Sequence, residues 1–321
     1  MAMLEVEALN VLFTTPQGKV AAVRDVSLEV VAGECLGIVG ESGSGKSQLF
    51  LACLGLIAPN GRASGSARLD GLELLDLDER ALQRVRGARA SMIFQDPMSA
   101  LTPHMRIGDQ LAEVLTTHRA LSRRQALARA AEVLSLVQIQ EPERRLRQYP
   151  HELSGGMRQR VMIAMAILCE PELLIADEPT TALDVTVQAQ ILDLLRTLTA
   201  QLNTALVLIT HDLGVVAGLA DRVAVMYAGR VVEQGTVADV LGAPTHPYTC
   251  GLLDSVPHLR AALEPLPIGI PGQPPDATVV TSGCAFVERC GYGDAVCRVE
   301  RPVLRPLAGR EIACHHPRSQ H

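Results

Sequence analysis

The feature that most constrains the chain is a glycine-rich octapeptide near its start. It consists of Gly40, Glu41, Ser42, Gly43, Ser44, Gly45, Lys46 and Ser47. The octapeptide fits the phosphate-binding pattern G-x-x-x-x-G-K-[ST], and it lies between a β-like run at residues 35–39 and a helical stretch at residues 48–56. In such a loop the backbone N–H groups surround phosphates, while Lys46 reaches the β and γ phosphates and Ser47 coordinates Mg²⁺. The alternative is a glycine-rich turn that only caps a helix.

The composition is that of a globular protein. The 321 residues are 48% apolar and 20% charged, with a formal net charge of −6. No apolar run approaches the roughly 18 residues that a membrane-spanning helix needs. The acidic balance argues against broad electrostatic binding to nucleic acid. We therefore expect no membrane span, no nucleic-acid partner and roughly two domains.

The pattern of β-like and helical segments predicts an α/β core. Short β-like runs at residues 6–13 and 26–31 precede the loop, and they indicate a small antiparallel β subdomain. A loop rich in Gly and Asn and a β-like segment at 69–75 follow the first helix. After a strand at 91–94, the chain is helical in period, and Ser122 with Gln125 forms a capping box. We expect a helical subdomain inserted at about residues 96–157.

Strands and helices alternate again after this insertion, which implies a parallel sheet. The expected order is a helix at 157–168, a strand at 173–176, a helix at 185–202, a strand at 205–210 and a hairpin over 223–233. Beyond about Pro244 the periodicity is lost and proline becomes dense. The expected domains are therefore residues 1–243 and a small module at residues 244–321.

Polar residues follow two of these strands. Asp177 and Glu178 come directly after the strand at 173–176, and His211 comes directly after the strand at 205–210. Ligands in parallel sheets gather at the carboxyl ends of strands, so Asp177 suits Mg²⁺ orientation and Glu178 suits polarisation of the attacking water. A helix cap is the alternative for the acidic pair, and a cap or surface residue for His211.

A second candidate anion site consists of Ser154, Gly155 and Gly156 at the start of a helix. Two phosphate sites with one phosphate loop make sense if each chain completes the nucleotide site of a partner. The run Leu-Ser-Gly-Gly-Met at 153–157 resembles the motif LSGGQ of ABC transporter ATP-binding subunits, which supplies that contact.

The resemblance to ABC ATP-binding subunits covers nearly the whole chain. It implies that Gln95 is the Q-loop residue, that Asp184 belongs to the D-loop with Ala182 and Leu183, and that His211 is the switch histidine. It implies that Glu178 is the catalytic glutamate and that Phe13 stacks on adenine; the alternative for Phe13 is an ordinary strand hydrophobe. The implied protein is an active ATPase that uses ATP and Mg²⁺.

Four cysteines lie close together near the end of the chain: Cys284, Cys290, Cys297 and Cys314. Their spacing lacks the paired C-x₂-C of common zinc ribbons and ferredoxins. A disulfide pair, inert thiols, a zinc site and an iron–sulfur cluster remain open, and a metal is favoured if the chain is cytosolic. His315 and His316 are further candidate zinc ligands.

The C-terminal region resembles that of oligopeptide and dipeptide importer ATPases. The shared elements are His246-Pro247-Tyr248-Thr249, Pro271-Gly272, Gly283-Cys284-Ala285-Phe286 and Arg289-Cys290, together with Phe94-Gln95-Asp96-Pro97-Met98 in the core. The resemblance implies a [4Fe-4S] cluster on the four cysteines, with zinc as the alternative.

The same resemblance implies the partners: two transmembrane permease subunits, a second ABC ATPase subunit and, indirectly, an extracytoplasmic peptide-binding protein. The implied location is peripheral, on the cytoplasmic face of the membrane. Import of nickel, glutathione or another small solute is an alternative, and a soluble ABC ATPase without a transport role is a weaker one.

Overall fold

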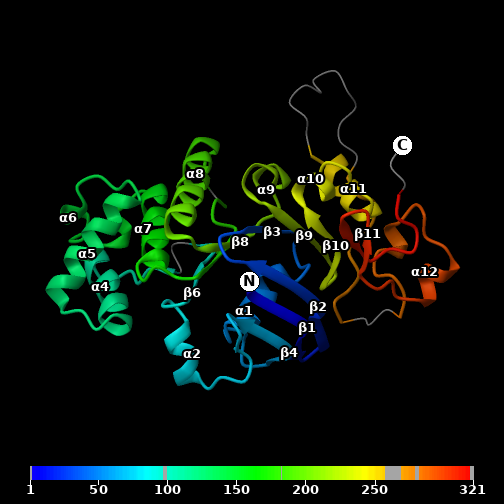
Figure 1. Cartoon of the computed structure of the whole chain (residues 1–321), viewed down its shortest axis with the longest axis horizontal. Coiled ribbons are helices and arrows are strands. Elements are labelled where there is room, and N and C mark those ends of the chain that lie inside the picture. Colours follow the sequence, from blue (N-terminus) through cyan, green and yellow to red (C-terminus); the bar gives the residue numbers. More distant parts are fainter. Residues whose placement is uncertain (1, 97–99, 182, 257–268, 279–281, 319–321) are drawn as a thin grey trace. The chain divides into compact units, whose positions relative to one another are not determined.

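The computed structural model describes residues 2–96, 100–181, 183–256, 269–278 and 282–318 (Figure 1). They form two compact units. Unit 1 comprises the described residues within 2–3, 30–34 and 76–208, and unit 2 comprises the remaining described residues. Pro97, Met98 and Ala182, which belong to the motifs above, lie outside the described residues.

Unit 2 contains a small antiparallel sheet. Strand β1 (Ala2–Thr15) lies between β2 (Gly18–Val31) and β4 (Gly61–Leu69), and β5 (Leu72–Glu73) pairs with β4. The predicted β subdomain is present, but residues 61–69 form a strand where a loop was expected. Only Leu69 in β4 has a large apolar side chain, so the strand is defined by pairing with β1 rather than by its own propensity.

The second sheet of unit 2 has the order β11-β12-β10-β9-β3. The strands are β3 (Cys35–Val39), β9 (Arg222–Tyr227), β10 (Arg230–Thr236), β11 (Arg305–Leu307) and β12 (Arg310–Ile312). Strands β3 and β9 are parallel, and the other neighbours are antiparallel. The predicted hairpin is therefore present, and β12 extends its sheet with residues from the end of the chain.

The helices of unit 2 are short. They are α1 (Lys46–Cys53), α9 (Leu213–Leu219), α10 (Val237–Val240), α11 (Pro247–Asp254) and α12 (Ala295–Val299), with a 3₁₀ turn at Val287–Arg289. Tyr227, Tyr248 and Phe286 form an aromatic cluster with ring centroids 4.5–5.4 Å apart. Because the chain has only eight Phe and Tyr residues, this cluster marks an unusual concentration of aromatic packing where residues after 244 meet β9.

A buried ion pair also joins these late residues to the sheet. The Glu233 carboxylate on β10 accepts hydrogen bonds from Thr245 N–H (3.0 Å) and His246 N–H (3.1 Å), and the Arg310 guanidinium lies 3.3 Å from it. Glu233 is fully buried. Removing one partner of such a pair costs about 3–5 kcal/mol, so this network ties the end of the chain to the sheet.

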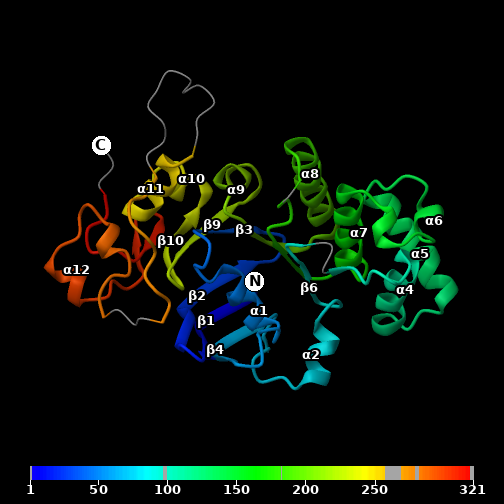
Figure 2. The same cartoon turned by 180° about the vertical axis from the view of Figure 1, so that it is seen from behind.

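Unit 1 contains three strands in the order β8-β7-β6, namely β6 (Ala90–Ile93), β7 (Leu173–Asp177) and β8 (Ala205–Ile209), the last residue of which belongs to unit 2. Its helices are α2 (Glu79–Val85), α4 (Ile107–His118), α5 (Arg123–Leu136), α6 (Pro142–Arg145), α7 (Gly155–Ile167) and α8 (Val185–Leu202), with a 3₁₀ turn at Pro150–Glu152. Helices α4, α5 and α6 lie together beside α7 in both views (Figures 1 and 2). The Ser122–Gln125 capping box opens α5 as predicted.

No helix in the described ranges is long and apolar enough to cross a membrane.

Candidate nucleotide-binding site

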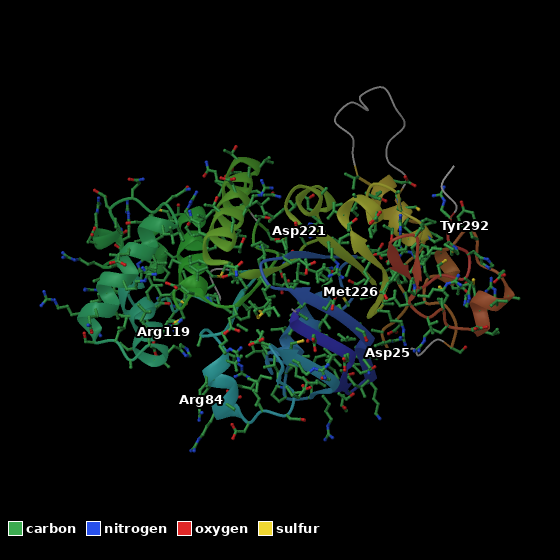
Figure 3. All side chains as sticks on the ribbon, viewed as in Figure 1. Asp25, Arg84, Arg119, Asp221, Met226 and Tyr292 are labelled. Carbon is green, nitrogen blue, oxygen red and sulfur yellow. The ribbon has the colours of Figure 1, made fainter. Side chains whose placement is uncertain are left out.

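The glycine-rich loop joins β3 to α1, which is the predicted strand–loop–helix context. Gly40 and Gly45 have φ values of 149° and 97°. A Cβ atom at Gly40 would lie 2.1 Å from the carbonyl oxygen of Met226, a buried residue of β9 labelled in Figure 3, and one at Gly45 would lie 2.2 Å from the carbonyl oxygen of Ala22. Only glycine fits both the backbone conformation and the space at these positions.

Lys46 lies inside the loop. Its Nζ atom donates to the carbonyl oxygens of Gly40 (2.7 Å) and Glu41 (2.9 Å) and contacts Ser44 Oγ (3.5 Å). The residue is only 7% exposed. A positive charge is thus held at the start of α1, where the N–H groups of the loop and helix also favour an anion. The adjoining Ser47 is in the first turn of the same helix.

Two residues from late in the chain contact Glu41 of the loop. Tyr248 Oη accepts a hydrogen bond from Glu41 N–H at 2.9 Å. The Arg289 guanidinium forms a bidentate ion pair with the Glu41 carboxylate at 2.8 and 2.9 Å. The loop is therefore held both by Lys46 and by residues of the C-terminal region.

In unit 1, the predicted site residues Gln95 and Glu178 contact each other just after the ends of two neighbouring strands. Strands β6 and β7 are parallel with Ile93 opposite Ala176, so Gln95 and Glu178 lie in equivalent positions two residues further on. Gln95 Nε2 donates to Glu178 Oε2 at 3.0 Å, and Thr181 Oγ1 donates to the same oxygen at 2.8 Å. Asp177 is 8% exposed at the end of β7.

The Glu178 backbone is in the left-handed region, with a φ of 46°. Non-glycine residues adopt this conformation at a cost, and such positions concentrate at functional sites. The backbone conformation and the two hydrogen bonds fix the Glu178 carboxylate. The adjacent ends of the parallel strands β6 and β7 therefore place an oriented carboxylate next to the side-chain amide of Gln95.

Ser154 caps α7, its Oγ accepting from Met157 N–H at 3.3 Å. Ser154 and Gly155 are exposed, and a Cβ atom added to Gly155 would meet no atom within 4 Å. The fold of this chain therefore does not demand glycine at 155. A Cβ atom at Gly156 would lie 3.2 Å from Val187, whose N–H donates to the Asp184 cap of α8 at 3.0 Å.

The remaining predicted residues of the nucleotide site lie in unit 2. Phe13 on β1 is half-buried, and its ring covers Gly61 of β4, where an added Cβ atom would be 2.6 Å from Phe13 Cε1. His211 is exposed just after β8.

The four clustered cysteines line one small cavity, together with His246, Phe286, Tyr292 and His316. None of the four forms a disulfide. Burial raises the pKa of the Cys314 thiol to about 12, and the three neighbouring thiols oppose its ionisation further. Thiols become metal ligands only when they ionise, and a bound metal ion favours that ionisation.

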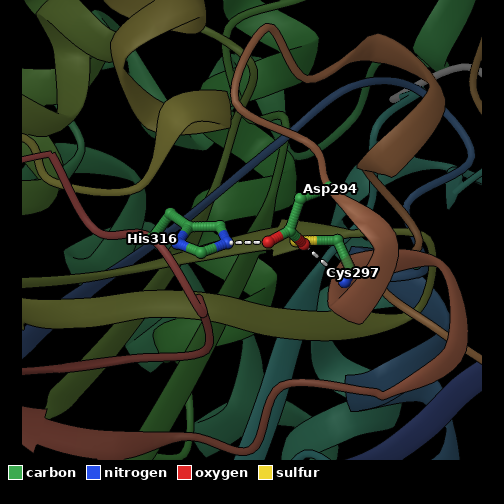
Figure 4. A group of neighbouring side chains, drawn as sticks. All are labelled: Asp294, Cys297 and His316. Carbon is green, nitrogen blue, oxygen red and sulfur yellow. Dashed lines mark hydrogen bonds and ion pairs between the residues drawn. The ribbon is translucent and has the colours of Figure 1, made fainter.

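Cys297 and His316, which line this cavity, also form a group with Asp294 (Figure 4). One ligand atom from each lies within 4.8 Å of the others. Asp294 caps α12 by accepting from Cys297 N–H at 3.0 Å, which lowers the pKa of the carboxyl to about 2, and it is 2.9 Å from His316 Nε2. These hydrogen bonds account for the arrangement without an ion.

Comparisons with known proteins identify the family of the chain. The oligopeptide transport ATP-binding protein OppD of Escherichia coli (strain K12) is 52% identical over 98% of this chain and 94% of its own length. The chain belongs to the ABC transporter family. Residues 23–181 match the ABC transporter sequence family, and residues 232–297 match the family described as the oligopeptide/dipeptide transporter C-terminal region.

Other ABC transporter proteins show the same likeness. The dipeptide transport ATP-binding protein DppD of Bacillus subtilis (strain 168) is 50% identical over 92% of this chain and 88% of its own length. A dimeric ATP-binding cassette, solved in a post-hydrolysis state with ADP and Pi, aligns with a TM-score of 0.66 at 29% identity, covering 73% of this chain and 99% of that one. The predicted ABC-type P-loop ATPase core is confirmed.

Several contacts of this ABC ATPase were not anticipated from the motifs. Thr181 fixes Glu178, and Gln159 Nε2 in α7 donates to the Pro179 carbonyl oxygen at 2.5 Å, which ties the Ser154 helix to the segment after Glu178. Tyr248 and Arg289 belong to the C-terminal resemblance, but nothing in the linear pattern indicated that they contact the loop.

Proposed function

We propose that the chain is the ATP-hydrolysing subunit of an ABC importer for dipeptides and oligopeptides. The observation that carries this proposal is the presence, in one chain, of a complete phosphate-binding loop and of the C-terminal region found in oligopeptide and dipeptide transporters. The names of the similar OppD and DppD proteins support the same solute class.

The proposed roles follow from the contacts of each residue. The loop at residues 40–47 binds the phosphates of ATP, and Lys46 exchanges its bonds to loop carbonyls for bonds to phosphate. Glu178, oriented by Gln95 and Thr181, polarises the attacking water. His211 contacts the γ phosphate and Phe13 stacks on adenine.

The proposed Mg²⁺ ligands are Ser47, Gln95 and Asp177, which supply the hydroxyl, amide and carboxylate oxygens that this cation prefers. When bound, Mg²⁺ neutralises the charge that develops on the phosphates.

A second ABC ATPase subunit completes the nucleotide site in this proposal. Ser154, Gly155 and Gly156 contact the nucleotide of the partner, and Asp184 lies in the D-loop next to them. The open surface at Gly155 supports this role, because a glycine that its own fold does not require leaves space for an approaching ligand. A solved bacterial ABC transporter cassette that aligns with this chain is a dimer.

Transport then follows from closure and release of the ATPase pair, which moves two transmembrane permease subunits between inward- and outward-facing states. An extracytoplasmic peptide-binding protein delivers the solute. The chain is a peripheral subunit on the cytoplasmic face of the membrane. We divide it into an ATPase domain at residues 1–243, with the helical subdomain at about 96–157, and an extension at 244–321.

We also propose that the extension holds a [4Fe-4S] cluster on Cys284, Cys290, Cys297 and Cys314. The four thiols fit because they line one cavity and need a positive partner to ionise. A cluster of this kind would pin an extension that has little core of its own. Zinc is the alternative.

Anaerobic purification followed by metal analysis tests the cluster. We expect about four iron and four sulfide per chain, and loss of both in the Cys314→Ser variant. Ser255→Ala, which changes a half-buried side chain outside the cavity, is expected to keep the iron. Stoichiometric zinc without iron would contradict the proposal.

Co-isolation tests the transport role. A tagged chain is purified from membranes in mild detergent, and its partners are identified by mass spectrometry. We expect two multi-spanning permeases and a homologous ATPase. Ribosomal or DNA-repair proteins in their place, with ATPase activity stimulated by nucleic acid, would contradict the importer role. Co-isolation of permeases from nickel or glutathione systems would change the proposed solute and leave the importer role in place.

A further inference from the structure

The phosphate-binding loop is attached to the C-terminal extension at one residue, Glu41. Both oxygens of the Glu41 carboxylate accept from the two terminal nitrogens of Arg289, at 2.8 and 2.9 Å. The Arg289 side chain is only 5% exposed. The two parallel hydrogen bonds fix the orientation of the guanidinium relative to the carboxylate as well as the distance between them, which a single hydrogen bond does not.

Arg289 is itself held in place by the extension. Its Nε donates to the Pro271 carbonyl oxygen at 2.9 Å, and Nη2 lies 3.3 Å from the Ile270 carbonyl oxygen. The guanidinium carbon is 5.7 Å from the ring centre of Tyr227 and 5.9 Å from that of Phe286. The ion pair with Glu41 raises the pKa of Arg289, so the residue stays charged at every relevant pH.

The backbone of Glu41 connects this contact to the ligand side of the loop. Its N–H donates to Tyr248 Oη at 2.9 Å, whereas its carbonyl oxygen accepts from Lys46 Nζ, also at 2.9 Å. One residue is therefore bonded to the extension through its side chain and N–H, and to the phosphate-binding lysine through its carbonyl. A displacement of the Glu41 side chain would move the carbonyl that positions Lys46.

We propose that Arg289 is a positioning residue for nucleotide binding, which sets the conformation of the phosphate loop through Glu41. The C-terminal extension thereby controls the ATP affinity of the ATPase domain. This inference rests on the proposed function, because it assumes that the loop at residues 40–47 binds ATP.

The same contact provides a route from the cysteine cavity to the loop. Arg289 ends the 3₁₀ turn Val287–Arg289, and the next residue, Cys290, lines the cavity. In a chain that carries the proposed cluster, loss of the cluster would release this turn and loosen the contact with Glu41. The structural state of the extension would then affect nucleotide affinity through Arg289 and Glu41.

A double-mutant cycle tests the pair. The dissociation constant of a fluorescent non-hydrolysable ATP analogue with Mg²⁺ is measured by equilibrium titration on the full-length chain within its transporter complex. Arg289→Gln and Glu41→Gln are each expected to raise the dissociation constant by roughly tenfold, as loss of one bidentate charge pair implies. The double variant should bind no more weakly than either single variant, because both changes remove the same contact.

Arg298→Gln is the matched control. Arg298 also neighbours a cavity cysteine, Cys297, and pairs with an acid, Glu288, at 2.9 Å, but both side chains are exposed. The dissociation constant of the ATP analogue for Arg298→Gln should stay within about twofold of the value for the unmutated protein. Arg289→Lys keeps the charge without the fork and should restore part of the affinity.

The outcomes separate this inference from the proposed function. Wild-type affinity in Arg289→Gln, or additive effects of the two single variants, would overturn it while ATP binding by the unmutated protein stands. If Arg289→Gln unfolds, Glu41→Gln still tests whether loss of the ion pair weakens ATP binding, because that substitution leaves the extension unchanged. Absence of ATP binding in the unmutated chain would instead refute the proposed function. Adding Cys290→Ala to the Arg289→Gln variant should weaken binding of the ATP analogue no further than Arg289→Gln does alone.

Discussion

Glu178→Gln is expected to bind ATP normally and to lose turnover by about 100-fold or more. The amide is nearly isosteric with the carboxylate, and its oxygen can still accept from Gln95 and Thr181. It cannot polarise the attacking water as an anion does. Equilibrium binding of ATP and phosphate release in a single turnover measure the two effects separately.

Glu170→Gln is the control for this prediction. Glu170 lies in the same unit and pairs with Arg129 on the surface, so its loss should leave both quantities unchanged within about twofold. Hydrolysis at the wild-type rate in Glu178→Gln would show that another group activates the water.

Gly155→Asp is expected to reduce steady-state turnover by about 100-fold without affecting the fold. A Cβ atom at this position meets nothing within 4 Å, so the substitution adds no clash inside the chain. In the proposed dimer the new carboxylate would face the phosphates of the nucleotide on the partner, where like charges repel. Thermal unfolding and ATP binding by the isolated chain should change little, whereas ATP-dependent dimerisation, measured by light scattering, should be lost.

Gly218→Asp provides the matched comparison, because Gly218 is an exposed helical glycine of α9 with equally open surroundings. It should dimerise and hydrolyse ATP like the unmutated chain. Normal turnover in Gly155→Asp would contradict the proposed contact with the partner's nucleotide and would leave Ser154 as no more than the cap of α7.

Local patterns predicted much of the core. Helix α8 has the predicted bounds, the Ser122 capping box opens α5, and β3, α1 and the loop between them follow from glycine spacing and apolar runs. These features depend on residues within a few positions of one another, where propensity and periodicity carry the information. The position of Glu178 at the carboxyl end of a strand was expected from the sequence, whereas its contact with Gln95 was not.

Contacts between distant residues were not predictable in this way. Strand β4 has one large apolar side chain and forms through pairing with β1. Arg289 lies 248 positions from Glu41, and a charged residue in a proline-rich region offers no sign of its partner. The pairing of β12 with β10 likewise depends on long-range packing, which overrides local propensity.

The central claim is that ATP hydrolysis by this chain drives peptide import, and transport into vesicles tests it most directly. The chain, its co-isolated permeases and ATPase partner are reconstituted with the peptide-binding protein on the opposite face, and uptake of a labelled oligopeptide is followed. The account predicts uptake that requires ATP and Mg²⁺ on the side of this chain and that falls by about 100-fold with Glu178→Gln. ATP hydrolysis without peptide uptake, or uptake that survives Glu178→Gln, would contradict it.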